Sequence, residues 1–159
     1  MNSNLIGTLL DSQRVACRVH VNSKKGALDL LSERLAADIE TLSQEQVFES
    51  LNGRERLGST GFGKGVALPH GRVANLDRPV GVFLVLDEAI DYDAIDGQPV
   101  DLLFALVVPE AATEEHLQIF AALSGLFSDE HVCQRLRACE TGNDAELLSL
   151  LTGDTASAA

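Results

Sequence analysis

Two nearly uninterrupted apolar segments constrain the fold of this chain more than any other feature. They read VGVFLVL at residues 80–86 and VDLLFALVV at residues 100–108. Both are rich in β-branched residues and too short to be buried helices, so they predict central strands covered on both faces. A short strand and a turn are expected between them. The short acidic connection favours at least one antiparallel pair, because parallel neighbours need a long crossover.

Further strands and helices are predicted around this centre. Residues 15–21 alternate as a short strand does, and VALPH predicts another strand that ends at Pro69 and His70. Apolar residues at three- to four-residue spacing, each set preceded by a capping residue, predict helices. These begin after Ser23, Ser43, Thr113, Ser128 and Asn143, and the second should end at Gly53. This order predicts an α/β fold, a single-domain mixed β-sheet flanked by helices on both faces.

The charge balance argues against two classes of partner. Among 159 residues, 12 Lys and Arg face 24 Asp and Glu, which gives a formal net charge of −12. Nucleic acids and anionic membranes need a cationic surface, so neither is an expected partner. No apolar segment reaches the ~20 residues of a membrane span, and no secretion signal begins the chain. We therefore expect a cytoplasmic protein without membrane insertion.

The three cysteines, Cys17, Cys133 and Cys139, cannot all pair within one chain and lack the spacing of a zinc site. Reduced thiols, at least one in the core, are the expected state.

Five acidic residues between the central strands lack the spacing of a calcium loop and are interpreted as a solvated rim. These are Asp87, Glu88, Asp91, Asp93 and Asp96.

The segment GSTGFGKG at residues 58–65 holds four glycines. This density indicates a backbone that is bent or closely approached by another group. The segment matches neither the P-loop nor the dinucleotide-binding pattern, so it does not predict a nucleotide site.

Among the four histidines, His70 is placed best for chemistry. It lies between Pro69 and Gly71 at the end of a predicted strand, and ligand sites of open α/β sheets lie beyond such ends. A nucleophile or a general acid or base suits this position, and a loop histidine without function is an equal alternative. His20 and His131 are expected to be solvated or structural.

His116 strengthens the functional interpretation of His70. With Thr113 as the cap, His116 is the third residue of its helix, where free N–H groups favour an anion and disfavour an imidazolium. A neutral His116 there can donate an N–H to a phosphoryl group, although a local capping or packing role is the alternative. Arg54 and Arg56 carry guanidinium groups that match phosphate oxygens, but a surface ion pair explains either one as simply.

The segment RERLGSTGFGKGVALPHGR, residues 54–72, resembles the active-site segment of EIIA proteins of the fructose/mannitol class (type 2) of the bacterial phosphotransferase system. AIDYDAIDGQPVDLLFALVVP and EEHL match that family in order and spacing. The chain most resembles the nitrogen-regulatory EIIA proteins, although Tyr92 stands where phenylalanine is usual. The resemblance implies an EIIA domain over residues 5–152, and the small, polar residues at 153–159 predict a flexible C-terminal tail.

The resemblance also implies a phosphohistidine relay. By the family's pattern His70 accepts the phosphoryl group on Nε2, and His116 and Arg54 stabilise it. Three further candidate binding residues lie on the same segment: Arg56, Ser59 and Thr60. The implied donor is a phosphorylated HPr-like protein, so no metal or cofactor is required. Potassium transporters and sensor kinases are the regulated partners that the nitrogen branch implies.

Other functions stay open. A sugar-specific EIIA of the fructose or mannitol type would pass the phosphoryl group to an EIIB during sugar uptake. A binding module would dock on partners according to its phosphorylation, which adds roughly −1.5 to −2 charges; this role is compatible with the first. A metal-dependent enzyme built on His70 and His116 would need a third ligand, and none is apparent in the sequence.

Overall fold

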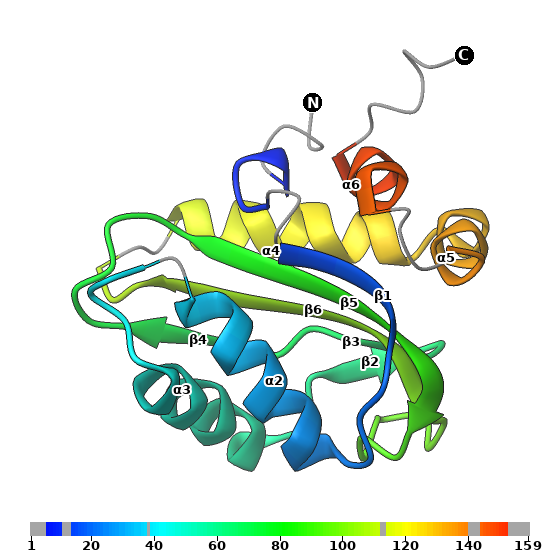
Figure 1. Ribbon diagram of the computed structural model, residues 1–159, viewed down its shortest axis with the longest axis horizontal. Coiled ribbons are helices and arrows are strands. Elements are labelled where there is room, and N and C mark those ends of the chain that lie inside the picture. The colour runs from blue at the N-terminus through cyan, green and yellow to red at the C-terminus, as the bar shows by residue number, and fades with distance from the viewer. Residues whose placement is uncertain (1–5, 11–13, 38, 112–113, 140–143, 153–159) are drawn as a thin grey trace.

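The computed structural model describes residues 6–10, 14–37, 39–111, 114–139 and 144–152. Its strands are β1 (Val15–Val19), β2 (Gly61–Gly63), β3 (Val66–Ala67), β4 (His70–Val73), β5 (Val80–Ile90) and β6 (Val100–Pro109). Its helices are α2 (Lys24–Ala36), α3 (Gln44–Leu57), α4 (Glu114–Phe127), α5 (Glu130–Arg137) and α6 (Asp144–Thr152). The strands form one mixed sheet, with α2 and α3 on one face and α4, α5 and α6 on the other (Figure 1). The predicted α/β class is confirmed.

The two apolar segments form β5 and β6, which pair antiparallel at the centre of the sheet. Their register sets Phe83 opposite Phe104. β1 runs parallel to β5 at one edge, while β3 and β4 run parallel to β6 on its other side. The prediction of a mixed sheet with an antiparallel pair is confirmed. The separate short strand predicted between the two segments is wrong, because β5 itself continues to Ile90.

β3 and β4 are two pieces of one interrupted strand beside β6. Val66 and His70 pair with β6 residues at the same offset, so both pieces share one register. The interruption lies at Leu68 and Pro69, since proline has no N–H to donate to a sheet. The prediction that His70 ends a strand is therefore wrong: His70 is the first residue of β4.

α3 does not end at Gly53, as the sequence predicts, but continues to Leu57. The buried residues Val47, Leu51 and Glu55 recur at four-residue spacing on one face of α3. Their packing outweighs the cost of a glycine in a helix interior, about 1 kcal/mol.

Side chains cap the helices largely as predicted. The hydroxyls of Ser23 and Ser43 accept backbone N–H groups in the first turns of α2 and α3. α5 departs from prediction, since the Asp129 carboxylate caps it and accepts two N–H groups. Ser128, the predicted cap, instead donates its hydroxyl to the carbonyl of Ser124. The predicted caps of α4 and α6 lie outside the described residues.

Each face of the sheet carries its own apolar core. Under α4, α5 and α6 the rings of Phe83, Phe104 and Phe127 pack with centroids 5.7–6.2 Å apart. Leucines of α2 and α3 pack on the other face. The three cysteines are buried in the core under α4, α5 and α6, in line with the prediction of at least one core thiol. The predicted tail at 153–159 lies outside the described residues.

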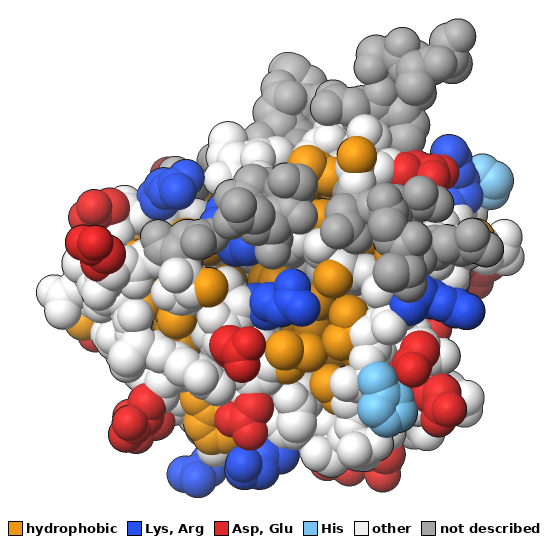
Figure 2. Space-filling model, viewed as in Figure 1, with side chains coloured by type: hydrophobic (Ala, Val, Ile, Leu, Met, Phe, Trp, Pro, Cys, Tyr) orange, Lys and Arg blue, Asp and Glu red, His pale blue; other side chains and the backbone are white. Residues whose placement is uncertain are grey.

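On the face shown in Figure 2, charged side chains of both signs are scattered around a central group of apolar side chains. Within the described part of the chain, no helix is long and apolar enough to cross a membrane.

Candidate functional site

His70, half-buried at the start of β4, is held by a hydrogen bond of its ring. Its Nδ1 lies 2.8 Å from the carbonyl oxygen of Leu68. Because a carbonyl only accepts hydrogen bonds, Nδ1 carries the proton and Nε2 the lone pair. Burial lowers the pKa of His70 below 6.5 and outweighs the bond to Leu68, while the charges of Arg54 and His116 lower this pKa further. The ring is therefore neutral at pH 7, with Nε2 as its nucleophilic nitrogen.

α4 places His116 and Phe120 beside His70. The ring centroids of the two histidines are 6.5 Å apart, with planes at 79°. The ring of Phe120, one helical turn beyond His116, lies 4.3 Å from that of His70 and 5.0 Å from that of His116, centroid to centroid. The structure thus brings the predicted histidine pair together around a phenyl ring. Sequence reasoning missed Phe120, whose one signal is its four-residue spacing from His116.

Arg54 lies in the last turn of α3, close enough for its charge to lower the pKa of His70. Its Nη1 donates to the carbonyl of Gly58 at 2.8 Å. A guanidinium has five N–H donors in a planar fork. Arg54 is therefore oriented by the loop after α3 while it keeps further donors for an anion.

Arg56 points elsewhere. Its side chain is exposed and lines a surface hollow of about 310 Å³ between α2 and α3, together with Lys24, Lys25, Leu28, Asn52 and Glu55. Among the described contacts, none joins Arg56 to His70 or His116. The structure thus places Arg56 at a hollow whose lining includes neither His70 nor His116.

Ser59 and Thr60 hold the loop between α3 and β2. The Ser59 hydroxyl donates to the carbonyl of Tyr92 at 3.2 Å and accepts the N–H of Gly61 at 3.1 Å. Thr60 is buried, and both its N–H and its hydroxyl donate to the carboxylate of Glu55. These two predicted residues therefore position the backbone beside the site. Sequence reasoning missed Glu55, because an acid between the two arginines of the RER segment predicts a solvated position.

Among the four glycines after α3, Gly61 has a steric cause. A Cβ on Gly61 would lie 2.9 Å from the Cβ of Ala94, so the loop after β5 approaches the β2 backbone closely, as expected. Asp96 of the same loop accepts the N–H of Lys64 at 3.0 Å. This bond, together with one from the N–H of Gln98, lowers the pKa of Asp96. All five residues of the predicted acidic rim are exposed.

The other two histidines lie at the surface, as predicted. Nδ1 of His20 is 3.1 Å from the Asp87 carboxylate, and its Nε2 is 3.0 Å from Oδ1 of Asn22. His131 is exposed in the first turn of α5. Among the residues that the structure describes, no three His, Cys, Asp or Glu side chains gather as a metal-binding group.

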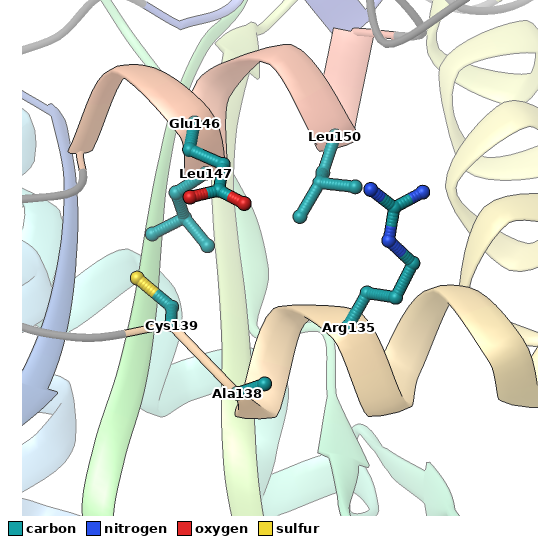
Figure 3. Close-up of a pocket in the computed structure, with 6 residues that line it drawn as sticks. All are labelled: Arg135, Ala138, Cys139, Glu146, Leu147 and Leu150. Atoms are coloured by element: carbon teal, nitrogen blue, oxygen red, sulfur yellow. The ribbon is translucent and has the colours of Figure 1, made fainter. Parts of the chain in front are cut away.

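A pocket of about 130 Å³ lies between α5 and α6 (Figure 3). Its lining comprises Arg135, Ala138, Cys139, Glu146, Leu147 and Leu150. No predicted site residue lines it, so it belongs to the packing of these two helices and not to the histidine pair.

Comparison with known proteins assigns the chain to a family. The family model described as "Phosphoenolpyruvate-dependent sugar phosphotransferase system, EIIA 2" matches residues 8–152. A nitrogen regulatory protein of Escherichia coli strain K12 is 44% identical over 148 residues, which span 92% of this chain and 89% of that protein. The crystal structure of the nitrogen regulatory protein IIA-Ntr from Neisseria meningitidis superposes with a TM-score of 0.86 at 39% identity, over 92% of this chain and 99% of that one.

A more distant structure shares the fold. It is the Escherichia coli enzyme IIAMtl, solved in complex with phosphorylated enzyme IIBMtl. Its TM-score is 0.73 at 22% identity, over 91% of this chain and 97% of that one. The match over residues 8–152 and the identity to nitrogen regulatory proteins lead to one conclusion. The chain belongs to the EIIA type 2 family of the phosphoenolpyruvate-dependent sugar phosphotransferase system, whose members are phosphotransfer proteins.

Proposed function

We propose that this chain is a phosphohistidine carrier of a nitrogen-related phosphotransferase system. A phosphorylated HPr-like protein donates the phosphoryl group, and Nε2 of His70 accepts it. The observation that carries the proposal is the 2.8 Å bond from Nδ1 of His70 to the carbonyl of Leu68, because it fixes the tautomer of the neutral ring with the lone pair on Nε2. The identity to nitrogen regulatory proteins supports this branch of the family.

The transfer requires no proton to leave His70. The lone pair of Nε2 forms the new N–P bond while the bond from phosphorus to the donor's histidine breaks, and the electrons of that bond return to the donor's ring. The proton on Nδ1 stays at the Leu68 carbonyl. The transition state is loose and spreads charge over three oxygens, so positioning and positive charge supply most of the catalysis. Arg54 contributes that charge, and a ring N–H of His116 contributes a hydrogen bond.

The output that we propose is regulatory. Phosphorylation adds roughly −1.5 to −2 charges beside His70 and changes what a partner meets there. We propose potassium transporters and sensor kinases as the classes of target, as the family resemblance implies, and the cytoplasm as the compartment in which the chain acts. The phosphorylation state of His70 is then the signal that these partners read.

A sugar-specific EIIA is the second candidate. The description of the family names sugar, and the IIAMtl structure holds a phosphorylated IIB protein. This function requires that the phosphoryl group pass from His70 to an EIIB. Incubation of the labelled chain with fructose- and mannitol-type EIIB proteins separates the two functions, because only a sugar carrier loses its label to them at a catalytic rate.

The accepting residue is tested by His70→Ala. This variant is expected to take up no acid-labile label from a phosphorylated HPr-like donor, since the accepting nitrogen is gone. His20→Ala is the matched control, because that exposed histidine pairs with Asp87 and should label normally. Circular dichroism checks that both variants fold. Normal labelling of folded His70→Ala would overturn the proposal.

A further inference from the structure

A buried carboxylate lies directly behind the candidate site. Glu55 follows Arg54 in α3, and its side chain is only 3% exposed. Nζ of Lys24 lies 2.9 Å from Oε1, and the Tyr92 hydroxyl donates to Oε2 at 3.1 Å. The N–H of Thr60, at 3.2 Å, and its hydroxyl donate to the same carboxylate. Two segments distant in sequence, the start of α2 and the loop after β5, therefore converge on one side chain of α3 together with the adjoining loop before β2.

The charge of Glu55 is matched within this cluster. Lys24 provides the opposite charge and also lies 4.7 Å from the centroid of the Tyr92 ring, within cation–π distance. Burial and the nearby carboxylate raise the pKa of Tyr92. Its phenol therefore stays protonated and donates a hydrogen bond to Glu55. A buried carboxylate with one cation and several donors holds its partners in place, since loss of its charge would leave them unmatched.

Hydrogen bonds lead from this carboxylate to the imidazole of His70. Glu55 holds the N–H of Thr60. The carbonyl of Thr60 accepts the N–H of Leu68 at 3.0 Å. The carbonyl of Leu68 accepts Nδ1–H of His70 at 2.8 Å. Each of these hydrogen bonds holds the residue whose carbonyl accepts the next one. The orientation of the His70 ring therefore depends on the position of Thr60.

The same loop also orients Arg54. Its Nη1 donates to the carbonyl of Gly58, two residues before Thr60. Displacement of Thr60 from Glu55 would therefore disturb both the accepting ring and the guanidinium beside it.

We infer that Glu55 is a positioning residue for phosphoryl acceptance, an inference that rests on the proposed function. Its carboxylate fixes Thr60 and, through Leu68, holds His70 as the Nδ1–H tautomer with Nε2 turned to the donor. Lys24 and Tyr92 keep the carboxylate in place. Being buried, Glu55 acts through these groups and does not touch the donor protein.

The test is Glu55→Gln, which keeps the shape of the side chain, removes its charge and replaces one acceptor with a donor. Glu49→Gln, an exposed position of the same helix, is the matched control. Labelling of Glu55→Gln at saturating donor is expected to slow by about tenfold or more, because small displacements of reacting groups are costly. The donor concentration that gives half the maximal rate should not change. Nitrogen NMR of the His70 ring should show a mixture of tautomers in place of Nδ1–H alone.

The tautomer is read without any donor, which separates this inference from the proposed function. If the wild-type chain takes no label on His70, the proposed function fails, and the tautomer still tests Glu55. If folded Glu55→Gln labels at the wild-type rate and keeps the Nδ1–H tautomer, the inference is overturned while the carrier function stands. Should Glu55→Gln not fold, Tyr92→Phe removes the hydrogen bonds of the Tyr92 hydroxyl to Glu55 and to Thr60 and should slow labelling about two- to fivefold. An unchanged rate and tautomer in that variant would also overturn the inference.

Discussion

The proposed function gives His116 two effects, a charge that lowers the pKa of His70 and a ring N–H donated to the phosphoryl group, and each effect has its own signature. His116→Ala removes a charge that lowers the pKa of His70, so that pKa is expected to rise towards 6.5. The same change removes a donor to the phosphoryl group, so labelling should slow by about tenfold or more. An NMR titration of the His70 ring and initial labelling rates measure the two effects.

His131→Ala, an exposed position on α5, is the control for both measurements. Its His70 titration and its labelling rate should match those of the wild type. Unchanged kinetics in folded His116→Ala would leave His116 with a packing role against Phe120 and remove it from the transfer step.

α3 crosses β4 so closely at Gly71 that a side chain does not fit there. A Cβ on Gly71 would lie 3.0 Å from both the Cβ and the carbonyl carbon of Ser50, and the Ser50 hydroxyl donates to the carbonyl of Arg72 at 2.8 Å. Gly71→Ala is therefore expected to push α3 away from β4 and to lower the free energy of unfolding by about 1–3 kcal/mol. Urea denaturation measures the loss. Labelling should slow as well, because His70 precedes Gly71.

Gly53→Ala is the matched counterpart within α3. No atom lies within 4 Å of a Cβ built on Gly53, and the residue is exposed inside a continuous helix. The substitution should raise the free energy of unfolding by about 0.5–1 kcal/mol, since alanine loses less backbone entropy in a helix. A destabilised Gly53→Ala would contradict the continuous helix, and an undisturbed Gly71→Ala would contradict the close crossing.

The sequence predicts well those elements whose secondary structure is determined by their own residues. β5 and β6 are apolar along most of their length, and no other secondary structure buries such short segments. The end of α3 and the start of β4 depend instead on contacts with other elements of the fold. Gly53 stays helical because the turns around it pack on the sheet. His70 belongs to a strand because it pairs with Leu106 of β6.

The candidate site follows the same division. His70 and His116 could be proposed from their neighbours and from the family pattern, yet their 6.5 Å approach depends on how β4 and α4 are placed. Glu55 could not be proposed, because a glutamate between two arginines predicts a solvated position. Its burial arises from Thr60 of the adjoining loop and from Lys24 and Tyr92, which distant segments supply.

At the scale of the whole molecule, the site draws on both helical layers, since α3 and α4 lie on opposite faces of the sheet (Figure 1). The charges of Arg54 on α3 and His116 on α4 both lower the pKa of His70 on β4, and the His116 ring lies 6.5 Å from that of His70. An exposed leucine lies near each of the two helical residues: Leu57 is 85% exposed and Leu117 is 71% exposed. Exposed apolar side chains beside a reactive group are typical of protein-docking surfaces.

The double substitution of Leu57→Ser and Leu117→Ser tests whether the phosphoryl donor docks on both layers at once. Each leucine is expected to contribute about 1 kcal/mol of apolar burial, so the donor concentration for half-maximal labelling should rise about tenfold to thirtyfold. The rate at saturating donor should stay the same, since neither side chain holds His70. Stability should change by less than about 0.5 kcal/mol. Glu33→Ser, exposed on α2, is the control for surface changes. If the rate at saturating donor and the donor concentration for half-maximal labelling both stay at wild-type values, the donor does not use these leucines. Docking must then rely on polar contacts around the site.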